Sequence, residues 1–232
     1  MGKYTFYTFL YIDDEYKSLS INGVKGDFEK QIITFIRCAE NLHRSLKFFA
    51  DSELFVLTNN SSFIRQKSRI LNCIEIPFHF DIPQGIKFFA AFHKIDAFKW
   101  FYENRSSEYS LLLDTDILCI NPIPQNLKNC IVNNIPVYYD ITNQVFPAYG
   151  RKVIISDKNK IMNIHSSIGL WAGGEFLGGP GAFFKQMYNN IQQMSKVYFS
   201  SYKNYHHEGN ETLFSSGIEF LLRNKIYHHE GN

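Results

Sequence analysis

The first half of the chain switches repeatedly between short apolar runs, which favour strands, and apolar positions with helical spacing. The apolar runs predict strands at 4–12, 54–57, 73–76 and 109–113. Helical spacing is clearest from Phe28 to Phe49 and over 86–102, and a more polar helix is predicted at 62–69. This βαβαβα order predicts an α/β fold, with a mostly parallel sheet and helices on both of its faces.

The second half is less regular. The sequence Asn-Pro-Ile-Pro at 121–124 turns the chain, and residues 142–165 carry no clear pattern. Small residues dominate 172–179, where glycines suit either a turn or a close approach to a ligand. The remaining predicted elements are a strand at 135–141 and helices at 181–199 and 211–223.

An Asp-Thr-Asp sequence follows the strand predicted at 109–113. That strand contains consecutive leucines, which is typical of a strand buried on both faces of a parallel sheet. Alternate side chains of an extended segment point to the same side, so Asp114 and Asp116 can reach one object. Carboxylate oxygens suit Mn²⁺ or Mg²⁺, and we therefore predict a metal site there. The alternative is a pair of solvated aspartates at a turn.

Composition narrows the class of protein. A chain of 232 residues with 45% hydrophobic and 20% charged residues is typical of one globular domain with a core. The net charge of +2 is too close to neutral to argue for nucleic acid or an acidic membrane surface. The 4 cysteines include no Cys-x-x-Cys pair, which favours reduced thiols and a cytoplasmic location over a cysteine zinc site.

The first residues are apolar, but the run is short and ends in the acidic residues 13–15. That pattern predicts a first strand rather than a signal peptide or a membrane span. Peripheral contact with a membrane stays open, as does the oligomeric state.

Taken together, these features resemble the GT-A glycosyltransferases. They are most similar to two retaining groups, the glycogenin and bacterial galactosyltransferases and the histo-blood-group transferases. Leu-Leu-Leu-Asp-Thr-Asp-Ile-Leu at 111–118 is similar to the first group's Tyr-Leu-Asp-x-Asp, which holds Mn²⁺ against the diphosphate of a nucleotide sugar. The resemblance implies a single Rossmann-like domain, with a nucleotide-binding half at 1–120 and an acceptor and catalytic half at 121–232.

The resemblance also implies a donor site. Thr8 lies in the segment that matches the first strand, and Tyr16 matches a tyrosine that packs on uracil. Lys94, in Phe-His-Lys-Ile-Asp, matches a cation that contacts the donor phosphates. Gly173 and Gly174 match the small-residue segment beside the donor sugar. The alternatives are an exposed loop tyrosine, a lysine on a solvated helix face and the glycines of a plain turn.

The catalytic residues implied by the resemblance lie near the C-terminus. Asn210 and Glu211 occupy the place of the blood-group His-Asp-Glu, whose side chain lies under the anomeric carbon, and Glu208 is the reserve. The alternative for Glu211 is an acid in the first turn of a helix, where negative charge is favoured. Tyr-His-His-Glu-Gly-Asn occurs at 205–210 and again at the C-terminus. The second copy resembles a His-x-x-Gly motif, which implies His228 as a third metal ligand.

The expected activity is transfer of a hexose from a UDP-sugar or another nucleotide-diphosphate sugar to a glycan, a glycolipid or another hydroxyl acceptor. Mn²⁺ or Mg²⁺ is the expected cofactor, and retention of configuration is favoured. A haloacid-dehalogenase-type phosphatase also has Asp-x-Asp after a strand, but it needs a downstream Gly-Asp-x-x-x-Asp that this sequence lacks. A sugar nucleotidyltransferase needs a Gly-rich phosphate loop, which residues 9–16 do not provide. The non-enzyme alternative is a module that only binds a carbohydrate or a nucleotide.

Overall fold

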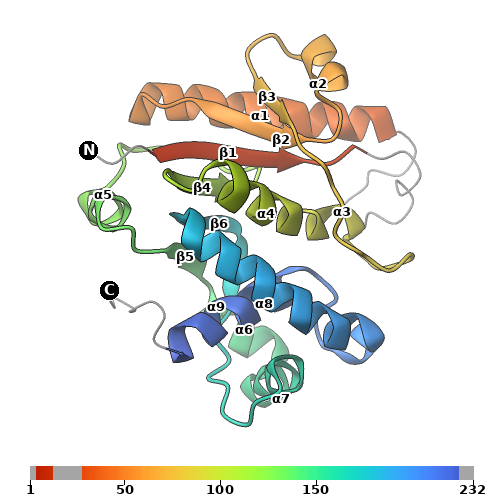
Figure 1. Cartoon of the computed structure of the whole chain (residues 1–232). Coiled ribbons are helices and arrows are strands. Elements are labelled where there is room, and N and C mark those ends of the chain that lie inside the picture. The colour runs from red at the N-terminus through yellow and green to blue at the C-terminus, as the bar shows by residue number, and fades with distance from the viewer. Residues whose placement is uncertain (1–3, 13–27, 225–232) are drawn as a thin grey trace.

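The apolar runs form the centre of a mixed sheet (Figure 1). The computed structural model describes residues 4–12 and 28–224, in which 6 strands belong to this sheet. The strands are β1 (Tyr4–Leu10), β2 (Leu54–Thr58), β3 (Asn72–Glu75), β4 (Tyr109–Leu113), β5 (Val137–Asp140) and β6 (Ala172–Pro180). Across the sheet their order is β3-β2-β1-β4-β6-β5, with parallel pairs from β3 to β4 and antiparallel pairs at β6. The predicted α/β class with a mostly parallel sheet is confirmed.

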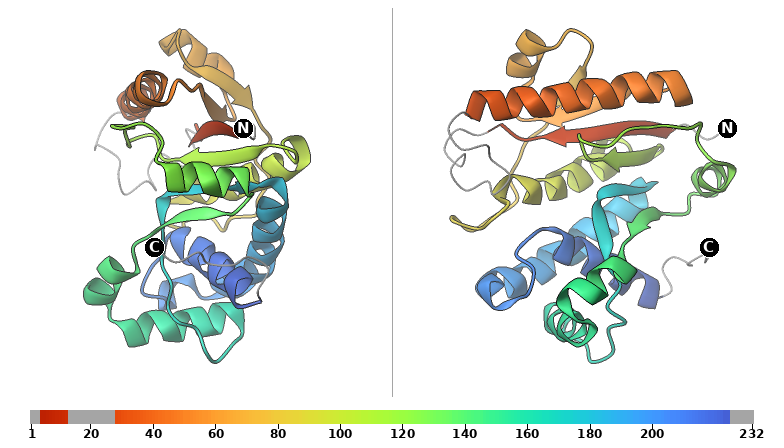
Figure 2. Two further views of the ribbon diagram at one scale, coloured as in Figure 1. Left: turned by 90° about the vertical axis from the view of Figure 1, so that its left-hand side faces the viewer. Right: turned by 180° about the vertical axis from the view of Figure 1, so that it is seen from behind.

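Helices cover both faces of this sheet (Figure 2). The helices are α1 (Phe28–Ala50), α2 (Ser61–Lys67), α3 (Phe89–Phe92), α4 (Lys94–Asn104), α5 (Gln125–Val132), α6 (Thr142–Tyr149), α7 (Arg151–Met162), α8 (Gly181–Ser200) and α9 (Glu211–Arg223), with a 3-10 turn at Tyr202–Asn204. On one face, Val56 packs in a core cluster with Ile36 of α1. On the other, Leu112 shares a cluster with residues of α4, α8 and α9. Within the described ranges, no helix is long and apolar enough to cross a membrane.

The leucine run of β4 is buried on both faces, as predicted. Leu112 belongs to the core beneath α4 and α8, whereas Leu111 and Leu113 belong to the cluster that contains Leu42 of α1. Because successive side chains of a strand point to opposite faces, this single run supplies both cores. Asp114, which follows β4, is therefore attached to a strand that is held by both cores.

The prediction of one helix over 86–102 is wrong in its first part. The chain forms the short α3 and then begins α4 at Lys94. Phe88 precedes α3 with a φ of 57°, a left-handed conformation that cannot continue a right-handed helix. The break places Lys94 in the first turn of α4, at the edge of the sheet where β4 ends.

The second half departs further from the sequence pattern. Helices α6 and α7 occupy 142–162, where no element was predicted, and Pro147 lies inside α6. The Gly-rich segment is not a plain turn, because it forms most of β6 between β4 and β5. A Cβ at Gly178 would lie 2.6 Å from the side chain of Leu111, so glycine is required for the close approach of these two strands.

Candidate functional site

The carboxyl ends of β1 and β4 lie side by side in the sheet. The chain runs outward from β1 to β2 and β3 and then crosses to β4 on the other side of β1. Strand order therefore reverses between β1 and β4. Open α/β sheets bind ligands beyond the carboxyl ends of their strands at such a reversal. Asp114 directly follows β4 at this position.

Lys94 and Asp114 form an ion pair at this reversal point. The Lys94 ammonium contacts a carboxylate oxygen of Asp114 and also donates to the carbonyl oxygen of Gly174 at 3.1 Å. The side chain of Lys94 is only 10% exposed, which contradicts the alternative of a solvated helix face. Because a buried ammonium needs partners, these contacts hold α4, β4 and β6 together at one point.

The carboxylate of Asp114 remains open to solvent. Its side chain is 30% exposed, and Asp116 is exposed in the turn that follows β4. The strand ends at Leu113, and Thr115 and Asp116 form that turn. The expectation of an extended chain from Asp114 to Asp116 is therefore wrong, but both side chains are accessible after the same strand.

Glu211 also lies beside Gly174. It is the first residue of α9, and its Oε2 accepts a hydrogen bond from Nε1 of Trp171 at 3.1 Å. A Cβ at Gly174 would lie 3.4 Å from Oε1 of Glu211 and 3.7 Å from Nζ of Lys94. The absence of a side chain at residue 174 thus leaves room next to both a carboxylate and an ammonium.

Aromatic and imidazole rings surround the Glu211 side of the site. The Trp171 ring makes edge contacts with His206 and His207, with centroids 5.3 Å apart in each pair. His206 is held by Asp157, 2.7 Å from its Nδ1, and Nε2 of His207 lies 3.8 Å from Glu211. Burial, assisted by the neighbouring His206, lowers the pKa of His207 to about 4. His207 is therefore neutral at neutral pH.

A further carboxyl group, Glu175, faces the same region. Its backbone carbonyl accepts from the amide of Asp114 at 2.9 Å. Burial raises the pKa of its side chain, and the nearby charges of Glu211 and Asp114 raise it further. A Cβ at Gly173 would lie 2.1 Å from Oε2 of Glu175, so this glycine makes room for that carboxyl group.

Three of the residues predicted for the site make contacts with other parts of the protein. Thr8 is fully buried and donates to the carbonyl oxygen of Leu113 at 2.8 Å, which ties β1 to β4. The amide of Asn210 donates to the carbonyl oxygen of Ala91 at 3.0 Å. Glu208 pairs with Lys87. Of the predicted catalytic residues, Glu211 is the one whose carboxylate lies beside Gly174.

The predictions for Tyr16 and His228 lie outside the described residues. The structure adds Trp171, Glu175 and His207, to which the sequence reasoning assigned no role. Two of them had a signal in the sequence, since Glu175 is the acid within the Gly-rich segment and His207 belongs to the repeated hexapeptide. Trp171 had none, because its contact with Glu211 spans 40 positions.

Asp114 and Asp116 suit a metal ion that is bound jointly by the protein and by a substrate. Among the described residues, no group of 3 or more His, Cys, Asp and Glu side chains is placed to hold a metal ion. Mg²⁺ and related ions are, however, commonly bound by one or two carboxylates together with the phosphates of a substrate. Asp114 and Asp116, both accessible from solvent, fit that arrangement.

Comparison with known proteins adds no family to this description. No protein-family model matches the chain, and no curated protein sequence matches it either. Inference about its function therefore depends on the site and on the sequence motifs.

Proposed function

We propose that this protein is a metal-dependent glycosyltransferase of the GT-A type. It transfers a hexose from a nucleotide-diphosphate sugar, with a UDP-sugar as the preferred donor, to a hydroxyl group of a glycan or glycolipid acceptor. The observation that carries the proposal is the Lys94–Asp114 pair at the strand-order reversal, with Glu211 beside the same glycine, Gly174. This arrangement offers a cation and a carboxylate to a diphosphate, and a second carboxylate to the sugar attached to it.

The donor diphosphate is bound on the Lys94–Asp114 side. Asp114 and Asp116 would hold Mn²⁺ or Mg²⁺, which supplies Lewis-acid neutralisation of the leaving phosphate when bound. The Lys94 ammonium, fixed by the carbonyl oxygen of Gly174, adds positive charge that needs no rearrangement during the reaction. Asp116 is the more exposed of the two aspartates and is therefore the easier one for an incoming ligand to reach.

The sugar is placed on the Glu211 side, next to Gly174. Trp171 holds Oε2 of Glu211, so Oε1 is the oxygen that faces Gly174. A negative carboxylate at this place stabilises an oxocarbenium-like centre, or attacks it as a nucleophile in a retaining reaction. Because His207 is neutral, it does not cancel the charge of Glu211.

A donor screen tests the proposal. Purified protein is incubated with each common UDP-, GDP- and CDP-sugar in MnCl₂, and released nucleotide is measured with and without EDTA. We expect metal-dependent release from one donor and its loss in the double variant Asp114→Ala/Asp116→Ala and in Glu211→Gln. Glu103→Gln is the control, because Glu103 is exposed on α4 away from these contacts. Release from none of the donors, or undiminished release by the double variant, would contradict the proposal.

A further inference from the structure

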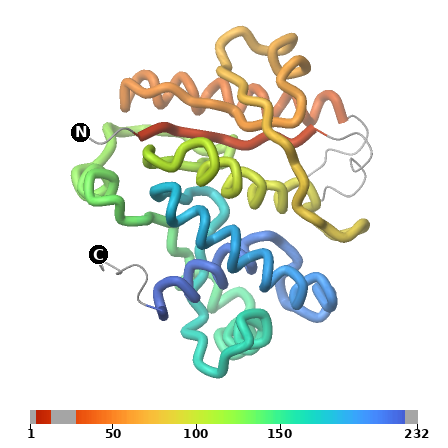
Figure 3. Tube along the Cα trace, viewed as in Figure 1, coloured from red at the N-terminus to blue at the C-terminus, as the bar shows by residue number. Residues whose placement is uncertain are grey.

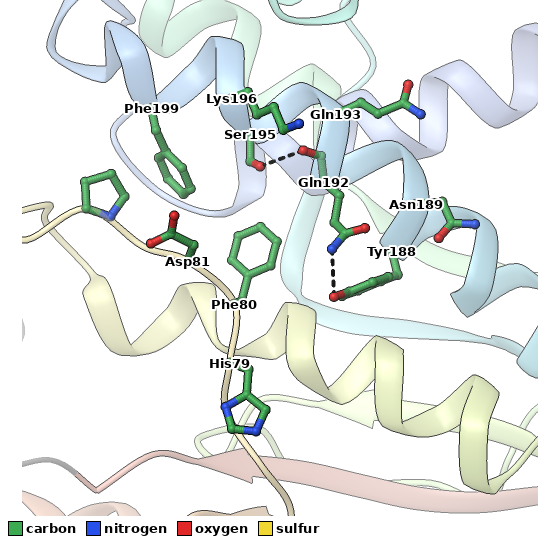
Figure 4. Close-up of a pocket in the computed structure, with 11 residues that line it drawn as sticks. His79, Phe80, Asp81, Tyr188, Asn189, Gln192, Gln193, Ser195, Lys196 and Phe199 are labelled. Carbon is green, nitrogen blue, oxygen red and sulfur yellow. Dashed lines mark hydrogen bonds between the residues drawn. The ribbon is translucent and has the colours of Figure 1, made fainter.

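A groove lies between α8 and the extended segment that follows β3. Figure 3 shows this segment leaving β3 and running across β1 toward the lower right of the view. Residues 79–83 of the segment and residues 188–199 of α8 line the groove, whose volume is about 790 Å³. In Figure 4, Phe80 and Asp81 of the segment lie opposite Phe199 and Ser195 of α8. This volume is within the range of small-ligand sites, which is about 300–1,000 Å³.

Aromatic rings form the apolar part of the groove. Phe80 and Tyr188 are almost fully buried, and Phe199 is half-buried. The rings of Phe80 and Phe199 come from opposite walls, and their centroids are 6.3 Å apart. The half-buried Phe199, held against Phe80, therefore offers an apolar ring surface with little freedom to move. Such a surface suits the C–H face of a sugar ring.

Carboxamides form the polar part. Asn189, Gln192 and Gln193 lie at helical spacing on one face of α8, and all three are exposed. Each amide has two N–H donors and one oxygen acceptor, which matches hydroxyl groups that both donate and accept. The amide of Gln192 donates to the hydroxyl oxygen of Tyr188 at 2.9 Å, which orients one member of the row (Figure 4).

The charges in the groove favour a neutral ligand. Its lining contains one acidic residue, Asp81, and one basic residue, Lys196, so the two charges offset each other. A phosphate-rich ligand would require an excess of cations, as nucleic acid does. Rings, amides and balanced charge together are the chemistry that recognises an uncharged carbohydrate.

Two sets of contacts fix the groove relative to the candidate site. The backbone amides of His79 and Phe80 donate to Oδ1 of Asp96 at 3.0 and 2.9 Å, in the same first turn of α4 as Lys94. On the other wall, the Tyr198 hydroxyl donates to the carbonyl oxygen of His207 at 3.0 Å. Each wall of the groove is therefore hydrogen-bonded to a segment that carries residues of the candidate site.

From these observations we propose that the groove binds a neutral oligosaccharide. In the transferase it holds the part of the acceptor glycan that lies away from the reacting hydroxyl group. That second statement rests on the proposed function, whereas binding of the oligosaccharide does not.

The test is a titration of the ¹⁵N-labelled full chain followed by NMR. The probes are linear tetrasaccharides of glucose, galactose and mannose, and a neutral tetrapeptide is titrated in parallel. We expect at least one tetrasaccharide to shift the amide signals of residues 79–83 and 188–199. Loss of two amide groups in Asn189→Ala/Gln193→Ala should weaken its binding about tenfold. Lys185→Ala, exposed on the same helix outside the groove, should bind like the unchanged protein.

Three outcomes overturn the proposal: no tetrasaccharide shifts these signals, the double amide variant binds as tightly as the unchanged protein, or the tetrapeptide binds more tightly than every sugar. The donor screen separates this proposal from the proposed function. Metal-dependent nucleotide release without tetrasaccharide binding overturns the groove alone. Tetrasaccharide binding without release from any donor supports the groove and overturns the transferase.

Discussion

Lys94–Asp114 and Lys158–Glu219 are both pairs of a buried lysine with a carboxylate, but they differ in access to solvent. In the second pair both side chains are 0% exposed, whereas Asp114 keeps 30% of its side chain exposed. The ammonium–carboxylate pair is thus shielded from solvent at Lys158–Glu219, the closed pair, and reached by solvent at Lys94–Asp114, the open pair. The difference separates a pair that holds the fold from a pair that can meet a ligand.

The closed pair has all its partners within the protein. The Lys158 ammonium also contacts the carbonyl oxygen of Leu170, and Glu219 accepts from the backbone amides of Ile168 and Leu170 at 2.7 and 3.2 Å. Burial lowers the pKa of Lys158, and the charge of Glu219 opposes that shift. These contacts fasten α7 and α9 to the segment that leads into β6. Neither side chain of this pair is exposed, so a ligand cannot contact the ammonium or the carboxylate.

In the open pair the ammonium is enclosed, whereas the carboxylate keeps contact with solvent as well as with the lysine. Lys94 is held by Gly174 and Asp114, and Asp114 faces solvent at the strand-order reversal. A carboxylate that water already solvates can exchange that water for a metal ion and phosphate oxygens. Solvent access to the carboxylate therefore distinguishes the candidate site from the structural pair.

Breaking the closed pair should have the largest effect on stability. Lys158→Met leaves the charge of Glu219 buried without a counter-charge, and we expect a loss of about 3–5 kcal/mol in the free energy of unfolding. Lys94→Met leaves Asp114 in contact with water, so the expected loss is only about 1 kcal/mol. Urea unfolding followed by circular dichroism measures both. Equal losses in the two variants would show that solvent access does not distinguish the pairs.

The opposite order is expected for activity. Asp114→Asn removes charge that a metal and a diphosphate require, and we expect kcat/KM for the donor to fall by at least about 100-fold. Its free energy of unfolding should change by less than about 1 kcal/mol, because the amide remains solvated. Steady-state nucleotide release, normalised to folded protein, provides the measurement. A variant that is fully active but poorly folded would contradict the assignment of Asp114.

His207, beside Glu211, should make stability depend on pH. Its pKa is about 4 in the folded protein and 6.5 when unfolded, so the unfolded chain binds more protons between these values. Stability should therefore fall as the pH is lowered from 7 to 5, and this residue should account for about 2 kcal/mol of the loss. His207→Gln cannot titrate, so the loss over this range should shrink by that amount. An unchanged pH dependence in His207→Gln would contradict the burial of a neutral His207.

Trp171 should have the smallest of these effects, and it should act on turnover rather than on folding. Trp171→Phe removes the N–H that holds Oε2 of Glu211 but keeps a ring against His207. We expect kcat to fall about tenfold, while KM for the donor changes little. Full kinetics with one donor separate the two constants. A rise in KM alone would show that Trp171 serves donor binding instead.

The elements that could be predicted from the sequence are those with a regular buried face. β4 and α9 match their predicted bounds because hydrophobic spacing alone defines them. β6 could not be predicted, because its glycines favour a turn in isolation and form a strand only through pairing with β4. α6 could not be predicted either, because it contains Pro147 and proline inside a helix is rare.

The candidate site was predictable only in part. The resemblance pointed to Lys94, Asp114 and Glu211, and the structure brings these residues together around Gly174. Contacts that depend on the folded chain, such as that of Trp171 with Glu211, leave no local pattern in a single sequence. Burial is equally hidden, and it is burial that assigns Thr8 to the joint between β1 and β4 rather than to a ligand.

The most direct test of the account is a thermal unfolding measurement with UDP and MnCl₂, alone and together. UDP at about 100 times its dissociation constant should stabilise the protein by about 2.7 kcal/mol when Mn²⁺ is present. We predict that the shift in melting temperature requires both ligands, that Asp114→Asn abolishes it and that Lys158→Met retains it. A shift of the same size in Asp114→Asn, or no shift in the unchanged protein, would contradict the assignment of the open pair as the donor site.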